Sequence, residues 1–180
     1  MVRLSILAPL MIGLIRVASV AALVGVLLAG GNLMAGEPFS VFLLRHAEKT
    51  AESVDPKLTP KGMARAQALK RLLKEAEIEA IHVTEYQRTK MTALPLADAL
   101  GLSIQVYPAN RFKDRVEAIK KRGGRHLFVG HSNTLLGLVK EFGGQPGDSI
   151  DYLTEFDRLY FLQSQSEGKV STVVMRYGAP

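Results

Sequence analysis

Apolar residues follow two alternating patterns along the chain: short continuous runs, and longer stretches in which they recur every three or four positions. The runs SVFLL at Ser40–Leu44 and HLFV at His126–Val129 are typical of strands buried inside a parallel sheet. From Pro60 to about Ala76 the apolar positions keep helical spacing, with Thr59 as the expected N-cap and proline at the first helical position. The chain is therefore expected to alternate strands with helices.

Carried through to the end, the pattern predicts six strands and four helices. The remaining strands are expected at Ala80–Val83, Ser103–Val106, Arg158–Gln163 and Lys169–Arg176, and the remaining helices at Arg88–Leu100, Arg111–Arg122 and Asn133–Phe142. Gly101 and the Gly143-Gly144 pair are expected to end two of the helices. The alternation predicts an α/β fold, a three-layer sandwich with a mainly parallel central sheet flanked by helices.

The first 36 residues do not fit this alternation. Arg3 and Arg16 are their only charged residues, and Val17–Ala29 is an uninterrupted apolar run followed by small residues. A basic start, a short apolar stretch and small residues are typical of a secretory signal peptide. The run is short for a membrane span, which needs about 20 apolar residues. The pattern favours a cleaved signal peptide, with an N-terminal membrane anchor as the alternative.

Two further features of the leader stay open at this point. Translation from Met11 rather than Met1 would place MIGLIR before the apolar run, which is a more ordinary signal peptide. An uncleaved leader would attach the protein to the inner membrane through residues 17–36. In either case residues 37–180 are expected to form a single domain that is exported, periplasmic or extracellular.

Composition and charge exclude several classes of protein. The chain of 180 residues has no cysteine, which excludes disulfide scaffolds, zinc ribbons and thiol catalysis. The chain has a formal net charge of +6, of which +4 belongs to the domain after the leader. The basic residues of this domain are scattered among acidic ones. Only Lys120–Arg122 with Arg125 forms a basic cluster, and no aromatic and basic motif accompanies it. Nucleic acid is therefore not an expected partner.

Basic side chains follow three of the expected strands, at the point where each strand ends. Arg45 and His46 follow the first strand, Arg88 lies just after the second in the chain, and His131 follows HLFV and Gly130. Because the carboxyl ends of parallel strands meet at one edge of a sheet, these four side chains are expected to converge. Cations gathered in this way repel one another unless an anion binds among them. A phosphoryl group suits the site, since guanidinium groups bind its oxygens in pairs and histidine can attack phosphorus.

The same segments resemble a known family. RHAEK at 45–49, LTPKGMARAQAL, TEYQRTKMTA and GHSNT look like the histidine phosphatase superfamily, which contains cofactor-dependent phosphoglycerate mutases and small phosphohistidine phosphatases. The resemblance runs from about Val41 to Tyr160, and in size and motifs it is nearest to the small phosphohistidine phosphatase-like members. It implies a phosphoglycerate mutase-like fold and a reaction that needs neither metal nor cofactor.

The resemblance also implies roles for individual residues. His46 becomes the nucleophile that is phosphorylated, and Arg45, Arg88 and His131 become the rest of the phosphate pocket. Ser132 and Asn133 are expected to bind substrate at a helix start, where backbone N–H groups add donors. Lys49 is close enough to His46 in sequence to touch a substrate. His82 and His126 are expected to be structural.

The sequence departs from the family pattern in two places. Ala47 stands where many members have glycine, although the small phosphohistidine phosphatases also accept alanine. Members that act on alcohol phosphates usually carry a glutamate some way after the second arginine, and here the candidates for the proton donor are Asp114 and Glu85, with Glu48 as a further one. Without a good donor, substrates with good leaving groups are favoured, such as phosphohistidine, acyl phosphates and aryl phosphates.

The leading hypothesis is an exported, metal-independent phosphatase that hydrolyses phosphate monoesters or phosphoramidates through phospho-His46. Its substrate would be a phosphorylated small molecule or a phosphoprotein, because the short segments Ala51–Lys57, Val106–Arg115 and Gln145–Thr154 predict an open pocket. A phosphoglycerate mutase-type phosphotransferase is one alternative, disfavoured by the expected export. A catalytically silent anion-binding module of the envelope is the other. The sequence does not indicate an oligomeric state.

Overall fold

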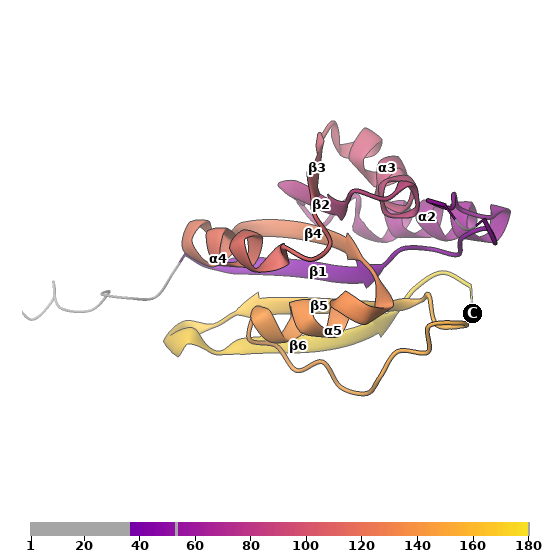
Figure 1. Ribbon diagram of the computed structural model, residues 1–180. Coiled ribbons are helices and arrows are strands. Elements are labelled where there is room, and N and C mark those ends of the chain that lie inside the picture. Colours follow the sequence, from indigo (N-terminus) through magenta and orange to yellow (C-terminus); the bar gives the residue numbers. More distant parts are fainter. Residues whose placement is uncertain (1–36, 53, 180) are drawn as a thin grey trace, which may run out of the picture. The chain divides into compact units, whose positions relative to one another are not determined.

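The computed structural model describes residues 37–52 and 54–179, which form the elements labelled in Figure 1. In chain order these are β1 (Phe39–Arg45), α2 (Pro60–Leu73), β2 (Ala80–Thr84), α3 (Gln87–Leu100), β3 (Ile104–Tyr107), α4 (Phe112–Arg122), β4 (Gly124–Gly130), α5 (Ser132–Glu141), β5 (Arg158–Ser164), the short 3₁₀ turn η1 (Ser166–Gly168) and β6 (Val170–Arg176). Every expected strand and helix is present, with small shifts at the ends.

The expected signal peptide or membrane anchor at 1–36 lies outside the described residues. Within residues 37–52 and 54–179, no helix is long and apolar enough to cross a membrane. The localisation expected from the leader therefore remains a prediction.

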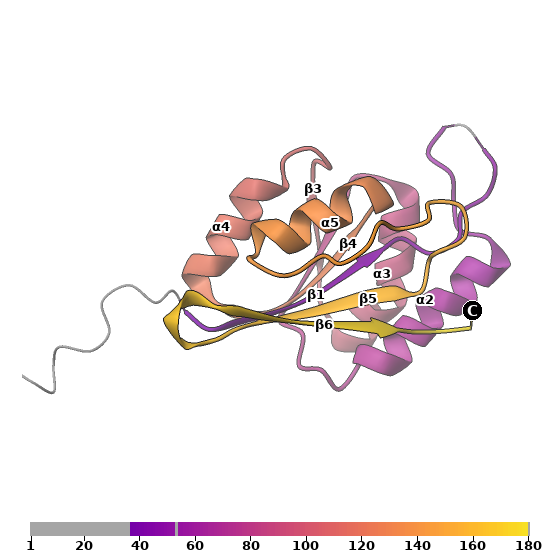
Figure 2. The ribbon, with the colours of Figure 1, turned by 90° about the horizontal axis from the view of Figure 1, so that it is seen from below.

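The six strands form one sheet in the order β3-β2-β4-β1-β5-β6. The first four run parallel to one another, while β5 is antiparallel to β1 and β6 is antiparallel to β5. Figure 2 shows the turn between β5 and β6 beside the start of β1, at the opposite end from the C-terminus. The prediction of a mainly parallel sheet inside an α/β fold is confirmed, with an antiparallel hairpin added at one edge.

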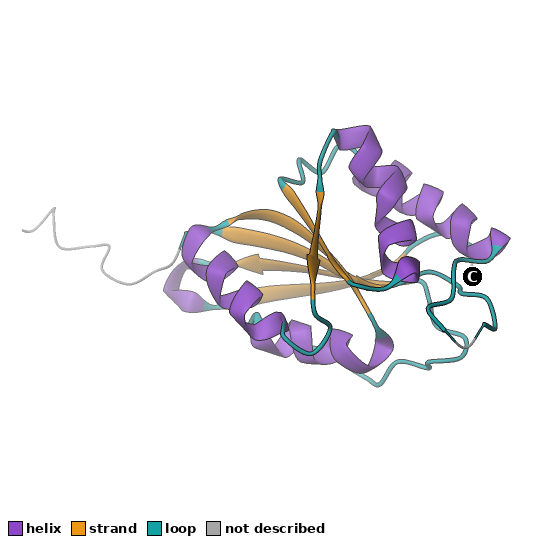
Figure 3. Ribbon diagram, turned by 45° about the horizontal axis from the view of Figure 1, so that its top comes forward, coloured by secondary structure: helices purple, strands orange, loops and turns teal. Residues whose placement is uncertain are grey.

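Helices cover both faces of the sheet, which gives the three layers visible in Figure 3. Alternate residues of β1 point to opposite faces, as the pleat of a strand requires. Phe42 and Leu44 pack in one apolar core with side chains of α2 and α3, whereas Val41 and Leu43 pack in a second core with side chains of α4 and α5. The continuous apolar run of β1 is thus explained by burial on both faces.

Helix ends follow the residues that mark them in the sequence. The Thr59 side chain accepts a hydrogen bond from the Gly62 N–H at 3.1 Å and caps α2, and Gly101 ends α3 in the left-handed conformation with φ of 66°. Helix α2 ends at Leu73 rather than at about Ala76. The chain turns away there, reaching Glu77 with a left-handed φ of 50°.

One edge of the sheet gathers the segments that carry the basic side chains. Strands β1 and β4 end side by side, with Arg45 paired to Gly130, and the His46 N–H donates to the Gly130 carbonyl at 3.0 Å. Because β5 is antiparallel to β1, the start of β5 lies at this same edge, with Leu44 paired to Leu159. The segment that precedes β5 therefore also arrives at this edge.

Helix α2 fixes the loop that follows His46. Gly62 lies against the backbone of Glu48, so that a Cβ atom added at Gly62 would overlap the Glu48 carbonyl oxygen. The same carbonyl accepts a hydrogen bond from the Thr59 N–H at 2.9 Å. The backbone close to His46 is thus held by direct contact with the first turn of α2.

We expect Gly62→Ala to destabilise the protein by about 1–3 kcal/mol, the range typical of overpacking a filled site. Gly137→Ala in α5 is the matched control, because its new methyl group would meet only Phe112, at an ordinary contact distance of 3.5 Å. The control is expected to be neutral, or more stable by about 0.5–1 kcal/mol through helix propensity. Urea unfolding of the two variants measures the difference, and equal effects would contradict the close approach.

Candidate active site

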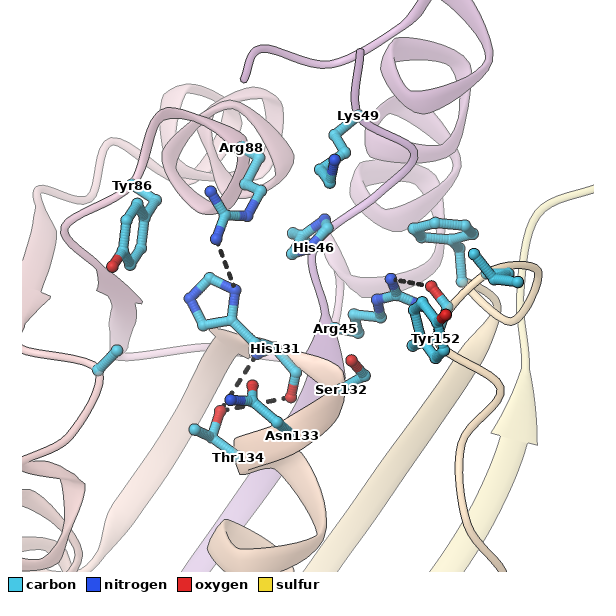
Figure 4. Close-up of a pocket in the computed structure, with 13 residues that line it drawn as sticks. Arg45, His46, Lys49, Tyr86, Arg88, His131, Ser132, Asn133, Thr134 and Tyr152 are labelled. Atoms are coloured by element: carbon cyan, nitrogen blue, oxygen red, sulfur yellow. Dashed lines mark hydrogen bonds between the residues drawn. The ribbon is translucent and has the colours of Figure 1, made fainter. Parts of the chain in front are cut away.

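A cavity of about 480 Å³ opens at the edge where β1, β2 and β4 end. Figure 4 shows His46, Arg88 and His131 directed toward its centre. The lining comes from five segments of the chain: Arg45, His46, Lys49, Tyr86, Arg88, Ala109, His131, Ser132, Asn133, Thr134, Tyr152, Leu153 and Phe156. None of these residues is a carboxylate, so the cavity is built to receive negative charge.

His46 is held as a neutral ring with one nitrogen available. Its Nδ1 lies 2.7 Å from the Ala47 carbonyl oxygen, which only accepts hydrogen bonds, so Nδ1 carries the proton. Within the described residues Nε2 has no hydrogen-bond partner, and in this tautomer it carries the free electron pair. Burial, partly offset by the bond to Ala47 and reinforced by the charge of Arg45, lowers the pKa of His46 to about 3. His46 is therefore uncharged across the physiological pH range, with the electron pair of Nε2 available.

His131 lies beside His46, with the two ring centres 5.4 Å apart. Its Nε2 contacts the Thr84 hydroxyl at 2.9 Å, and Thr84 contacts the Thr89 hydroxyl at 3.0 Å. The Thr89 hydroxyl donates to backbone carbonyls, so Thr84 donates to Thr89 and accepts from His131. With Nε2 of His131 as the donor, Nδ1 of the same ring carries the free electron pair and lies 3.4 Å from Nη2 of Arg88. Burial and the charge of Arg88 lower the pKa of His131 to about 4, so this ring is also neutral until an anion enters.

Two arginines supply the positive charge: Arg45 is buried, and Arg88 is partly buried and lies 3.9 Å from the Asp55 carboxylate. The Arg45 guanidinium lies 4.0 Å above the Phe156 ring, and the Arg88 guanidinium lies 4.3 Å above the Tyr86 ring. The Nε atoms of both arginines are buried without a hydrogen-bond partner in the described part of the chain. Burial lowers the pKa of both groups, although arginine keeps its charge. A buried N–H group without a hydrogen bond costs free energy, so a bound anion that accepts from these Nε–H groups would be stabilised.

The first turn of α5 adds backbone donors. The Thr134 and Leu135 N–H groups donate to the His131 carbonyl at 3.1 and 2.9 Å. Ser132 and Asn133, which line the cavity, have no acceptor for their N–H groups among the described residues. The start of a helix carries partial positive charge and favours an anion.

The structure brings together most of the site residues expected from the sequence. Those that line the cavity are Arg45, His46, Lys49, Arg88, His131, Ser132 and Asn133. His82 and His126 lie elsewhere, bonded to each other at 3.0 Å, with His126 also bonded to the Gly123 carbonyl.

The three carboxylates considered as proton donors do not line the cavity. Asp114 has a highly exposed side chain (81%) and pairs with Arg111 at 3.6 Å, over a separate hollow. Glu85 accepts a hydrogen bond from the Ala109 N–H at 3.0 Å. Glu48 is held by Arg65 through contacts of 2.8–3.1 Å. Among the described residues, no group of three or more histidine and acidic side chains is arranged to hold a metal ion.

Some lining residues were not expected from the sequence. Tyr86, inside the TEYQRTKMTA motif but not named as a site residue, forms an aromatic wall beside Arg88 and His131. Tyr152 and Leu153 belong to the Gln145–Thr154 segment expected beside the pocket, and Phe156 follows it, but none of the three was singled out. The only signal that could have identified them is the antiparallel pairing of β5, which brings its N-terminal end to this edge.

Comparisons with known proteins find a family model that matches part of the chain. Residues 41–115 match the family model of the histidine phosphatase superfamily (branch 1). No curated protein sequence matches the chain. Together with the fold described next, the family match confirms the resemblance that the sequence motifs indicated.

Solved structures share the fold at low sequence identity. The protein histidine phosphatase SixA complexed with tungstate is 21% identical with a TM-score of 0.62, covering 77% of this chain and 97% of that one. SixA from Nakamurella multipartitia is 19% identical with a TM-score of 0.57, covering 81% and 100%. Mycobacterial glucosyl-3-phosphoglycerate phosphatase is 12% identical with a TM-score of 0.59, covering 80% and 100%. At these identities the likeness establishes the fold.

The depressed pKa of His46 predicts a directly measurable titration. A histidine with a folded pKa of about 3 stays neutral from mildly alkaline pH down to about pH 5, whereas the unfolded residue titrates near its ordinary value of about 6.5. We expect the ring Cε1 resonance of His46, assigned by its loss in His46→Asn, to stay unchanged over that range. The same chain in urea serves as the control. A midpoint near 6.5 in the folded protein would contradict the neutral nucleophile.

Proposed function

We propose that this chain, a small member of the histidine phosphatase superfamily, is a metal-independent phosphatase that hydrolyses phosphate monoesters or phosphoramidates through a phosphohistidine on His46. The observation that carries the proposal is the free Nε2 of a neutral His46, facing a cavity that two arginines and, among the described residues, no carboxylate line. A neutral nitrogen nucleophile beside unpaired guanidinium donors suits attack on a phosphoryl group.

In the first step, Nε2 attacks phosphorus in line with the leaving group. The Nε2–P bond forms as the bond from phosphorus to the leaving oxygen or nitrogen breaks, and the leaving group keeps the electron pair. Nδ1 keeps its proton, donated to the Ala47 carbonyl, which supports the positive charge that the ring gains. The donors of Arg45 and Arg88 neutralise charge on the equatorial oxygens.

His131 responds to the bound anion. Negative charge next to a neutral histidine raises its pKa, so Nδ1 of His131 gains a proton and changes from an acceptor facing Arg88 to a donor toward the phosphoryl oxygens. In the second step, water attacks phosphorus and the Nε2–P bond breaks. Inorganic phosphate leaves, and His46 returns to its neutral form.

The leaving group defines the substrate class. Because no carboxylate of the described residues lines the cavity, its wall has no acidic side chain to protonate a leaving group in the way that glutamate does for alcohol phosphates. Substrates whose leaving groups need little protonation are therefore favoured, such as phosphohistidine, acyl phosphates and aryl phosphates.

Structures of related folds agree with an oxyanion in this cavity. Tungstate is bound in a SixA structure, and inorganic phosphate and VO₃ are present in structures of mycobacterial glucosyl-3-phosphoglycerate phosphatase. Tungstate and vanadate imitate the phosphoryl group in charge and size. We propose that both bind between Arg45, Arg88 and His46 of this chain and inhibit its reaction.

The proposed setting is outside the cytoplasm. It rests on the sequence pattern of residues 1–36, with its two arginines and short uninterrupted apolar run. The substrate, a phosphorylated small molecule or a phosphoprotein, would then be encountered in the periplasm or at the cell surface.

We expect the purified protein to hydrolyse an aryl phosphate in the presence of a metal chelator. His46→Ala should lower kcat by at least about 10³-fold, because the nucleophile is lost. His131→Ala keeps the nucleophile and is expected to retain a slower reaction. Mass spectrometry at alkaline pH should find phosphate on His46 in the wild type and in His131→Ala. Activity that survives His46→Ala, or that requires a divalent metal, would contradict the mechanism. Anion binding by the wild type without turnover would indicate a silent anion-binding module.

Dependence on the leaving group tests the substrate class. Across a series of aryl and alkyl phosphates, kcat/KM should fall steeply as the pKa of the leaving alcohol rises, since proton donation to it is weak. Introducing a carboxylate at the cavity wall, as in Ala109→Glu, is expected to flatten this dependence. A flat dependence in the wild-type protein would show that a proton donor is already in place.

A further inference from the structure

The Arg45 guanidinium is engaged by the backbone of one loop. A guanidinium has five N–H donors. Nη1 of Arg45 donates to the carbonyls of Asp151 at 3.3 Å and Glu155 at 3.0 Å, and Nη2 donates to the carbonyl of Tyr152 at 2.6 Å. Figure 4 shows the bond to Tyr152 as a dashed line. Three of the five donors are thus taken by residues 151–155.

The two donors that remain form one edge of the planar group. They are the Nε–H, which is buried without a partner in the described part of the chain, and the second hydrogen of Nη2. Nε and Nη2 are neighbours on the guanidinium, and this edge matches two oxygens of a phosphoryl group. The three carbonyls consequently decide how Arg45, which is 6% exposed, can receive the anion.

This loop, residues 148–157, has little apolar packing at its tip. Tyr152 and Leu153 are 66% and 67% exposed. Ile150 and Phe156 make packing contacts toward the two ends of the loop, and within the described chain the exposed tip between them has only polar contacts to hold its position. Those polar contacts come largely from a second buried arginine that does not line the cavity.

Arg158, at the start of β5, makes those contacts. It is 8% exposed, and it donates to the carbonyls of Asp148 at 2.8 Å and Ser149 at 3.2 Å and to the Glu155 carboxylate. It also donates to the Tyr160 hydroxyl at 3.0 Å. Arg158 thus binds both ends of the loop at once.

Glu155 completes the arrangement from within the loop. Its carboxylate accepts from Arg158, from Arg176 at 2.7 Å and from the Asp151 N–H at 3.2 Å. Burial alone would raise the pKa of Glu155, but these hydrogen bonds lower the pKa below its ordinary value, so the group stays charged. The Glu155 side chain is fixed between two arginines while its carbonyl holds Arg45.

We propose that Arg158 and Glu155 are positioning residues for Arg45. They hold the 148–157 loop so that its carbonyls orient the Arg45 guanidinium and leave the Nε and Nη2 edge toward the phosphoryl oxygens. The inference rests on the proposed function, because it assigns Arg45 to the bound anion. Neither positioning residue touches the substrate, and both act through the loop backbone.

The experiment combines activity with anion binding in the full chain. In Arg158→Lys the charge is kept, but a lysine cannot reach two loop ends in the fork geometry of arginine. We expect kcat/KM for an aryl phosphate to fall about 10- to 100-fold, because a mutation far from the reacting atoms can lower the rate by this much when it moves a catalytic group. Tungstate affinity measured by calorimetry should weaken as well. Arg125→Lys is the matched control, since Arg125 also binds a glutamate and a carbonyl, at 2.7 and 3.0 Å, at the opposite end of the sheet.

Coupling to Arg45 separates positioning from a general loss of stability. If Arg158 acts through Arg45, the double variant Arg45→Lys/Arg158→Lys should lose little beyond Arg45→Lys alone, in both activity and tungstate affinity. The proposal would be overturned if the losses of the two single variants multiplied in the double variant, or if Arg158→Lys behaved like the wild type. Should Arg158→Lys fail to fold, Glu155→Gln, which keeps the shape of the side chain, is used in the same cycle.

Tungstate binding keeps this test independent of turnover. If the wild-type chain binds tungstate but hydrolyses no aryl phosphate, the proposed phosphatase function fails, and the binding cycle still decides whether Arg158 and Glu155 position Arg45. If turnover is observed but Arg158→Lys binds tungstate as tightly as the wild type, the positioning role is wrong and the phosphatase function stands.

Discussion

Positive charge at the wall of a cavity that no described carboxylate lines is the constraint on which this site depends. Arg45 and Arg88 each keep a buried Nε–H that has no hydrogen-bond partner among the described residues. Water has little access to such groups, so their desolvation is offset only when an anion arrives. Burial, reinforced by the charges of the neighbouring arginines, keeps both histidine rings neutral, and a neutral His46 is what the proposed attack on phosphorus requires.

The sheet topology explains what the sequence could reveal and what it could not. The motifs after β1, β2 and β4 are local, and the carboxyl ends of parallel strands meet by rule, so Arg45, His46, Arg88 and His131 could be placed at one edge from the sequence. The Gln145–Thr154 segment was expected beside the pocket, but the wall formed by Tyr152, Leu153 and Phe156 could not be assigned. That wall depends on β5 running antiparallel to β1, a pairing that apolar periodicity does not specify.

The partners of the three candidate carboxylates also could not be predicted from the sequence. Asp114 and Glu85 are close to the motifs along the chain, yet Asp114 faces solvent on α4 and Glu85 bonds to the backbone of Ala109. Glu48 follows His46 by two positions, but Arg65 binds both of its oxygens and also holds the carbonyls of Tyr177 and Ala179. Which partner a carboxylate finds is settled by tertiary contacts, not by its distance along the chain.

The hydrogen bond from His46 Nδ1 to the Ala47 carbonyl determines which ring nitrogen can receive a phosphoryl group. Imidazole can carry a phosphoryl group on either nitrogen, and the two products are distinct regioisomers that differ in lability. With Nδ1 occupied as a donor to its own backbone, only the nitrogen remote from the main chain is open to phosphorus. In the proposed reaction the intermediate would therefore be a single isomer, the τ-phosphohistidine, selected by one peptide carbonyl.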